Sequence, residues 1–425
     1  MRPSHLLFLT AAAGVILAGC GGGSSPGEGL DATAEAYVRL VLAVGRHDPN
    51  YVDAYYGPKA WKEDADRGDP VPLHELLSRT RDLLARVRAA VPSDRREFLE
   101  KQLVSIEGFL RRLLGERMTL TEEARLLYDI DPPVRRAEEF ESARAVLESL
   151  LPGEGDLAAR LKAFRDGFTV PADRLPKVAE ACLAELRRRT AALVALPAGE
   201  SFRIAFVSRK PWGAYNWYQG NLSSLIEVNT DLPTGVSTLF GTLAHEGYPG
   251  HHTMNALLEE RLVRGKGWRE FQVAPLFSPN SLIAEGTANV GIEIVATDTE
   301  RLEFERDVLA PVAGLSGLDF ERAERVRKAM EPVKYATGEA ARSLLDEGRS
   351  EAEVLAFLRR YALEDEPRAR KAIEFARTYR AYEFTYTAGE DLVRAYVGTG
   401  PDRVKRFFDI LERPVTPSML RRERG

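Results

Sequence analysis

The residues of this sequence best suited to chemistry lie in one stretch, HEGYPGHH, at positions 245–252. Three of the six histidines in the chain fall within it. Many zinc hydrolases carry His-Glu-x-x-His on a helix, where histidines four residues apart share one face. Here Pro249 stands where the second histidine of that motif belongs, and His251 and His252 follow it. The stretch is therefore either an altered metal site or a group of histidines with no shared ligand.

A regular helix would keep these histidines from binding one ion. His245 and His251 would lie about 120° apart around the axis, and His245 and His252 about 10 Å apart along it. However, Pro249 lacks an amide hydrogen and crowds the carbonyl of His245, and Gly250 adopts backbone angles closed to other residues. The two residues together predict a break in the helix, which would bring His251 or His252 back towards His245.

A further ligand is expected on a second helical pattern, SLIAEGTANVGIEIVA. Glu285 interrupts its apolar stretch, and a carboxylate in such surroundings is costly unless it is paired or bound to metal. The alternative for Glu285 is a carboxylate near the helix start that faces solvent. Asn289 follows one turn later and is placed to orient the Glu285 carboxylate, and Glu293 lies a further turn along the same side. Glu246, next to the first histidine, is the candidate general base.

The combination of HEGYPGHH with a downstream AEG resembles the signature of the domain of unknown function 885 family. Members carry His-Glu-x-x-Pro-Gly-His and then Glu-Gly, typically Glu-Gly-Trp, and are viewed as related to mostly helical, thermolysin-like zinc peptidases whose third ligand is a glutamate. The segments YTAGEDLVRAY and RFFDILERPVTPSML also resemble the closing segments of that family. The resemblance covers residues 200–425 well and the N-terminal half loosely.

The resemblance implies a role for each residue of the motif. His245, His251 and Glu285 would hold one zinc ion, and Glu246 would be the base. His252 falls where relatives vary, which suggests a partner of a ligand or of the oxyanion. Thr287 occupies the position where tryptophan is usual, so the lining of the pocket, and with it the substrate, is expected to differ.

The function that these residues predict is metal-assisted hydrolysis of a peptide or small amide. Zinc would polarise the scissile carbonyl and acidify water, while Glu246 passes a proton to the leaving amine. Tyr382 and Tyr386 are candidate donors to the oxyanion, with core packing as the alternative for each. The segment Ser224–Thr230 is expected to be a strand whose edge pairs with the substrate backbone, or else an ordinary buried strand.

Two other functions fit the same residues. A catalytically inactive zinc-binding envelope lipoprotein, acting as a scaffold or binding module, would hold metal without turnover. A purely structural helical protein, whose histidines cap a kinked helix, would hold no stoichiometric metal. A hydrolase of a non-peptide amide or ester would carry the same residues as a peptidase.

The N-terminus resembles the export signal of a bacterial lipoprotein. Arg2 precedes an apolar run over residues 6–18, which is shorter than the roughly 20 residues needed to span a bilayer. The run ends in LAGC, which resembles a lipobox and makes Cys20 the expected site of lipidation. The alternative is an ordinary signal peptide cleaved near Gly19.

The glycine- and serine-rich stretch after Cys20 reads as a flexible tether. We therefore expect a signal peptide at 1–19, a tether at 20–29, and a mature protein held to a membrane of the bacterial envelope by lipid, on the periplasmic side if the cell is Gram-negative. Cys182, in an apolar helical pattern, is expected to be a buried structural thiol. The net charge of −5 gives no electrostatic footprint for nucleic acid.

The elements that must position the site are mostly helices. Helical patterns occupy the first half, including residues 31–46, 72–91, 94–115, 134–150, 155–167 and 173–196. The stretch 201–233 is rich in aromatic and β-branched residues and predicts two or three short strands. Helical patterns then run from Val236 to the end, with a long one at about 367–397.

These patterns predict a mainly α fold, a multi-helix, two-lobed, metallopeptidase-like body with a small β-sheet before the metal-binding helix. The N-terminal helical lobe would span residues 30–200. The metal-binding lobe would span 201–425, with its short sheet at 201–230. A composition of 44% hydrophobic and 29% charged residues is that of a globular protein of this kind.

Overall fold

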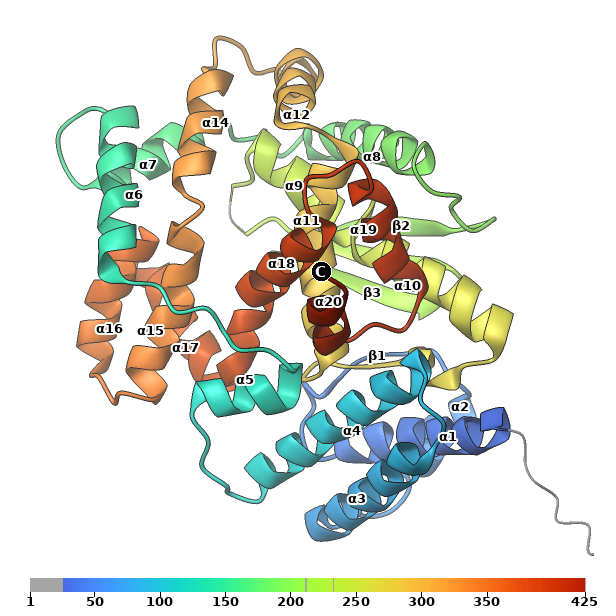
Figure 1. Ribbon diagram of the computed structural model, residues 1–425. Coiled ribbons are helices and arrows are strands. Elements are labelled where there is room, and N and C mark those ends of the chain that lie inside the picture. The colour runs from blue at the N-terminus through green and yellow to red at the C-terminus, as the bar shows by residue number, and fades with distance from the viewer. Residues whose placement is uncertain (1–25, 211, 232, 425) are drawn as a thin grey trace, which may run out of the picture.

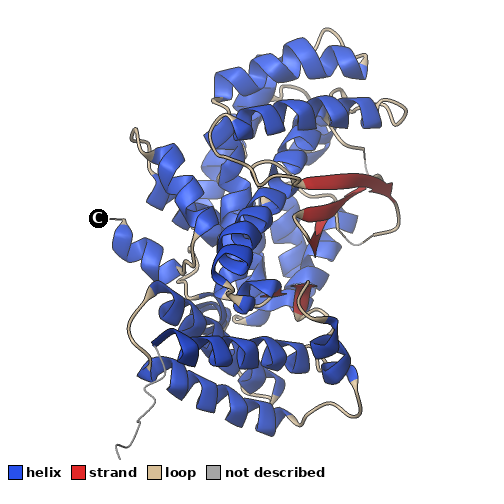
Figure 2. Cartoon of the chain, turned by 90° about the vertical axis from the view of Figure 1, so that its right-hand side faces the viewer, coloured by secondary structure: helices blue, strands red, loops and turns tan. Residues whose placement is uncertain are grey.

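The structure is a computed structural model, and it describes residues 26–210, 212–231 and 233–424. The chain is mainly helical over these residues, with small sheets on one side of the molecule (Figures 1 and 2). The expected signal peptide at 1–19 and the lipidation site at Cys20 lie outside the described residues.

Eight helices form the first part of the described chain. They are α1 (Pro26–Val44), α2 (Lys59–Asp66), α3 (Leu73–Ala89), α4 (Asp94–Leu113), α5 (Leu120–Tyr128), α6 (Ala137–Leu150), α7 (Leu157–Asp166) and α8 (Leu175–Ala191). Side-chain caps explain several starts: the Ser93 hydroxyl accepts from Arg96 N, and Thr119 forms a capping box with Glu122. Helix α1 begins at Pro26, so it takes in the last residues of the segment 20–29 that was expected to be a flexible tether.

The predicted strands form a three-stranded sheet directly before the HEGYPGHH stretch. Strand β4 (Ser223–Asn229) lies in the centre, parallel to β2 (Ser201–Val207) and antiparallel to β3 (Ala214–Gly220). The expectation that Ser224–Thr230 offers a free edge is therefore wrong, because β4 is paired on both sides and β3 is the edge next to it. A second, two-stranded sheet, which the sequence did not predict, pairs β1 (Val52–Tyr55) with β5 (Val273–Pro275).

Helices dominate again after the sheet. They are α9 (Val236–Glu246), α10 (His251–Leu258), α11 (Pro279–Val295), α12 (Asp298–Phe304), α13 (Ala310–Ala313), α14 (Phe320–Ala329), α15 (Ala336–Leu345), α16 (Glu351–Phe357), α17 (Glu366–Tyr379), α18 (Glu383–Val397), α19 (Arg403–Glu412) and α20 (Pro417–Glu423), with short 3-10 and π segments between some of them. The long helix expected at 367–397 is two helices, α17 and α18. They are separated at Arg380, whose φ of 52° no α-helix accommodates.

The hydrophobic core joins the two halves of the sequence. Its largest cluster combines residues of α1, α3, α4 and α5 with residues of α10, α11, α18 and α19. A second cluster packs α8 and α9 against the inner face of the sheet, where Ile226 and Val228 are buried. Residue 200, expected to divide two lobes, therefore does not divide the core, and helix α11 is packed from both halves of the chain.

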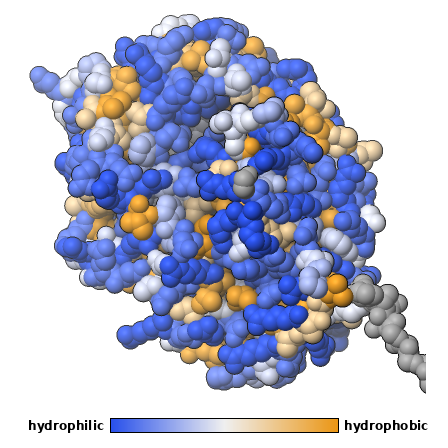
Figure 3. Space-filling view, in the orientation of Figure 1, coloured by the Kyte–Doolittle hydropathy of each residue, from blue (hydrophilic) through white to orange (hydrophobic). Residues whose placement is uncertain are grey.

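The surface seen in Figure 3 is mostly polar, with apolar side chains scattered in small groups. Among the described helices, none is both long enough and apolar enough to cross a bilayer.

Candidate metal centre

The chain breaks its helix within HEGYPGHH. Helix α9 ends at Glu246 and α10 begins at His251, and between them Gly250 N donates to Ala244 O at 3.0 Å. The turn is so tight that a Cβ at Gly250 would lie 1.8 Å from the carbonyl oxygen of His245. The predicted break is confirmed, and only glycine fits at this position.

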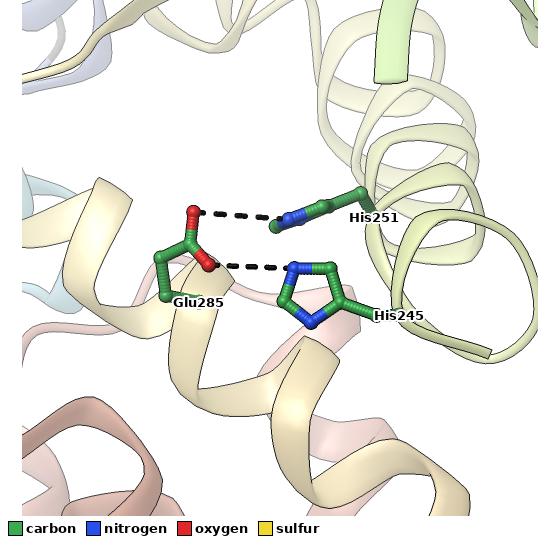
Figure 4. A group of neighbouring side chains, drawn as sticks. All are labelled: His245, His251 and Glu285. Atoms are coloured by element: carbon green, nitrogen blue, oxygen red, sulfur yellow. Dashed lines mark ion pairs between the residues drawn. The ribbon is translucent and has the colours of Figure 1, made fainter. Parts of the chain in front are cut away.

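The break brings His245 and His251 together and turns both towards Glu285 on α11 (Figure 4). The two imidazole rings lie 4.6 Å apart between centroids and are nearly perpendicular, at 89°. One donor atom from each of the three residues lies within 4.8 Å of the other two. Nε2 of His245 is 3.4 Å from Oε2 of Glu285, and Nε2 of His251 is 3.8 Å from Oε1. Ligands of a tetrahedral zinc ion lie about 3.3 Å apart, so the donors need little movement to share one.

The surroundings of Glu285 fit a metal ligand. Its side chain is buried, and among the described residues Oε2 accepts no hydrogen bond within normal geometry and faces only Nε2 of His245, an arrangement that is costly for a carboxylate. Oε1 accepts one hydrogen bond, from the Tyr382 hydroxyl at 3.1 Å. Two imidazoles and a carboxylate are a donor set that suits zinc. The residues therefore fit a zinc ion, which would take up the free lone pairs.

The charges of the site shift its titrating groups in different directions. Burial lowers the pKa of His245, but the hydrogen bond and charge of Glu285, with the charge of Glu246, outweigh it and raise that pKa to about 9. Burial, reinforced by the charge of His245, lowers the pKa of His251 to about 4. Burial also acts to raise the pKa of Glu285, yet its contacts with the two histidines hold it below the usual value. Without metal, His245 is therefore protonated at neutral pH and Glu285 is ionised.

Asn289 orients the first histidine, His245, and not the Glu285 carboxylate that the sequence predicted as its partner. Its Oδ1 lies 3.0 Å from Nδ1 of His245, and its Nδ2 donates to the Tyr386 carbonyl at 3.1 Å. Because Nδ1 carries the proton in this contact, Nε2 of a neutral His245 is left free to face Glu285 and His251. Asn289 also links α11 to α18.

The close packing of α11 on α18 depends on Gly286, the residue after the carboxylate ligand. A Cβ there would lie 2.3 Å from the carbonyl oxygen of Gly389. The helices therefore cross with their backbones in contact, which brings Tyr382 and Tyr386 to the site. The hydroxyl of Tyr382 reaches Glu285, and the Tyr386 ring packs edge-on against the Tyr382 ring at 5.6 Å.

Glu246, the predicted base, follows His245 at the end of α9 and is buried at 8% exposure. Burial raises its pKa to about 7, with the positive charge of His245 opposing and the carboxylates of Glu285 and Asp53 adding to the shift. Its backbone carbonyl accepts a hydrogen bond from Nδ2 of Asn216 on β3 at 2.6 Å. The edge strand is thus anchored directly to the residue that would handle the proton.

Glu293 and Thr287 lie away from the cluster. Glu293 pairs with Arg394 on α18 and makes no contact with a ligand among the described side chains, so the expectation that it helps to orient the site is wrong. Thr287 is buried, donates to the carbonyl of Ile283 at 2.9 Å and contacts Met254. It fills a gap between helices instead of lining the cluster.

His252 also lies elsewhere than expected. It is fully buried behind the bend, where Nε2 lies 3.0 Å from Glu200 Oε2 and Nδ1 lies 2.9 Å from the Ser224 hydroxyl. It is therefore no ligand of the cluster and no donor to an oxyanion there. The choice between His251 and His252, which spacing left open, falls on His251.

A buried carboxylate, Glu200, holds the bend from behind. Its Oε2 accepts from the Tyr248 hydroxyl at 2.5 Å and pairs with His252, while Arg187 donates to its Oε1 at 2.8 Å. Burial acts to raise the pKa of Glu200, but these hydrogen bonds outweigh it and lower the pKa. No periodic pattern marks this residue in the sequence, because it precedes β2 and meets its partners only in the folded chain.

Asp53 and Tyr215 were also absent from the sequence-based site. Asp53 lies on β1 and Tyr215 on β3, and the Tyr215 hydroxyl donates to Oδ1 of Asp53. The pair is linked to the cluster through β3, because Asn216, the residue after Tyr215, donates to the Glu246 carbonyl. No spacing rule connects two residues so far apart in sequence.

Comparison with known proteins supports the fold alone. No protein-family model and no curated protein matches this chain. Its structure is similar to that of a "putative lipoprotein" from Colwellia psychrerythraea, with a TM-score of 0.51 and 13% identity over 83% of this chain and 69% of the other. A "putative lipoprotein of unknown function" from Shewanella oneidensis gives a TM-score of 0.45 at 13% identity, over 85% and 75% of the two chains. The class that fold and site define is a mainly helical protein with a His-His-Glu cluster, and membership of the domain of unknown function 885 family stays a prediction.

Proposed function

We propose that this protein is a zinc-dependent hydrolase, acting on peptide bonds. The observation that carries the proposal is the convergence of His245, His251 and Glu285, with one carboxylate oxygen left without a partner in a buried setting. A glutamate with a raised pKa, Glu246, follows the first histidine directly. Ligands and base are the minimum set for metal-assisted hydrolysis.

Each residue of the site would have a separate role in the reaction. Bound zinc would polarise the substrate carbonyl and acidify a water molecule. Glu246 would accept a proton from the attacking water and deliver it to the leaving amine. Asn289 holds His245 in the orientation that leaves Nε2 free. The Tyr382 hydroxyl, which donates to Glu285 in the structure, would turn to donate to the negative oxygen that develops on the substrate.

We propose further that the protein acts in the bacterial envelope as a lipid-anchored protein. The support is the lipobox-like LAGC that ends at Cys20, together with the printed name, "putative lipoprotein", of the structurally similar protein from Colwellia psychrerythraea. The substrate would then be a peptide or small amide met outside the cytoplasm.

A peptide-library digest tests the enzymatic role. The zinc-loaded protein should cleave a subset of peptides, and Glu246→Gln should lower the rate by about 10²–10⁴-fold while retaining zinc, since the carboxylate moves the proton and binds no metal. Mass spectrometry of the digest and metal analysis of both proteins are the measurements. Zinc bound with no cleavage of any peptide would favour the catalytically inactive binding module instead.

A further inference from the structure

Asp53 lies at an irregularity in its strand and is joined to the strand that contacts Glu246. It is hydrogen-bonded to Tyr215 on β3, and the next residue of β3, Asn216, donates to the Glu246 carbonyl. In the β1–β5 pair, Val52 is opposite Pro275 and Ala54 is opposite Ala274, so Asp53 is an extra residue with no partner of its own. A β-bulge of this kind turns one side chain out of the regular alternation, and bulges are frequent beside active sites for that reason. Here the residue so placed carries a charge.

The carboxylate of Asp53 is held in place but not neutralised. The Tyr215 hydroxyl donates to Oδ1, and a tyrosine contributes no positive charge. No lysine, arginine or histidine forms an ion pair with Asp53 among the described side chains, and Oδ2 accepts no hydrogen bond from them. Burial raises the pKa of Asp53 to about 6, with the hydrogen bond from Tyr215 opposing and the charge of Glu285 adding to the shift.

Carboxyl groups outnumber basic side chains around the site. Asp53 acts on the pKa of Glu246, and Glu285 acts on that of Asp53, so the three carboxyl groups share one electrostatic environment. Among the described side chains, no lysine or arginine forms an ion pair with any of the three. A site with an excess negative charge and restricted access to water favours a cationic group on its ligand.

Aromatic side chains of β3 and of the loop before it gather beside Tyr215, the partner of Asp53. The rings of Tyr215 and Trp217 lie 4.4 Å apart, and Trp212 lies 5.3 Å from Tyr215. The Lys210 ammonium sits 4.9 Å from the Trp212 ring centroid and pairs with Glu227, so its charge is already matched. Trp217 is 37% exposed, which leaves ring surface available to a ligand cation.

We propose that Asp53, held by Tyr215, recognises an ammonium group of the substrate and makes the site selective for it. This rests on the proposed hydrolase function and names its substrate class, a peptide or amide with a free α-amino group or a basic side chain beside the reacting bond. Asp53 Oδ2 accepts the ammonium, and the rings of Tyr215 and Trp217 cover it.

Calorimetric titration of the full-length, zinc-loaded protein with three small amides tests the proposal. The probes are leucinamide, with a free α-ammonium, N-acetyl-lysinamide, with a side-chain ammonium, and N-acetyl-leucinamide, with neither. We expect at least one cationic probe to bind about tenfold or more tightly than the neutral one, as a charge-assisted hydrogen bond provides. Comparison of the two cationic probes shows whether the site prefers an α-amino group or a side-chain ammonium.

Three variants assign the preference to the residue. Asp53→Asn should abolish it, Asp53→Glu should retain part of it, and Glu63→Gln, which removes an exposed carboxylate on α2, should leave it unchanged. Equal binding of all three probes, no binding of any, or a preference that survives Asp53→Asn would overturn the proposal. The titration measures binding and does not require catalysis. A protein that binds the cationic probes but cleaves no peptide would therefore refute the proposed hydrolase function and leave the cation site intact.

Discussion

Zinc binding should release a proton from His245, and the affinity should therefore depend on pH. With a pKa raised to about 9, His245 is protonated at pH 7 in the metal-free protein, whereas a zinc ligand must be neutral. The zinc affinity therefore rises with pH up to about 9 and decreases as the pH falls below that value. Over the two units from pH 9 to pH 7 the cost is about 2.7 kcal/mol, or roughly a hundredfold in the dissociation constant. His251, with a pKa of about 4, adds nothing in this range.

Calorimetry at pH 7 in buffers with different ionisation enthalpies measures the protons released, and we expect about one from His245. The variant Glu246→Gln is a matched test, because it removes a carboxylate charge that raises the pKa of His245. Its zinc affinity should depend less on pH near neutrality. An affinity that stays constant between pH 7 and 9 in the unmodified protein would refute the ion pair between His245 and Glu285.

Two more substitutions test how the bend is maintained. Gly250→Ala places a methyl group 1.8 Å from a carbonyl oxygen. It should therefore destabilise the fold by at least about 2 kcal/mol in thermal unfolding and weaken zinc binding. The control Gly241→Ala, whose Cβ meets nothing within 4 Å, should be neutral or slightly stabilising. Equal behaviour of the two would contradict the tight turn. Glu200→Gln should lower zinc affinity about tenfold, because Tyr248 and His252 lose a charged acceptor. Competition with a chelator measures this affinity. An unchanged affinity would show that the bend does not depend on the hydrogen bonds to Glu200.

The local chemistry of the site was predictable from sequence because it depends on neighbours in the chain. Pro249 and Gly250 break the helix for reasons of backbone geometry that hold in any fold. Glu285 stood out because it interrupts an apolar pattern, and Asn289 because it lies one helical turn away. Each of these expectations uses a spacing of at most a few residues.

The parts that were not predictable depend on contacts between distant segments. Strand order is one example. β4 pairs in parallel with β2 as well as with β3, so β4 is central and β3 is an edge strand. The pattern within a single strand does not show which strands it pairs with. Glu200 and Asp53 are others, since their partners are far away in sequence or reached only through the bend and the bulge. Glu293 follows the helical repeat of α11 correctly but meets Arg394 on α18, which helical periodicity does not reveal.

The most direct test of the account is the metal content of the purified protein. Elemental analysis after purification without added metal should find about one zinc ion per chain in the unmodified protein and in His74→Ala, which removes an exposed histidine on α3, and close to none in His245→Ala, with all three folded by circular dichroism. Zinc retained in full by His245→Ala, or absent from the unmodified protein even after zinc is supplied, would contradict the claim that His245, His251 and Glu285 form a metal centre.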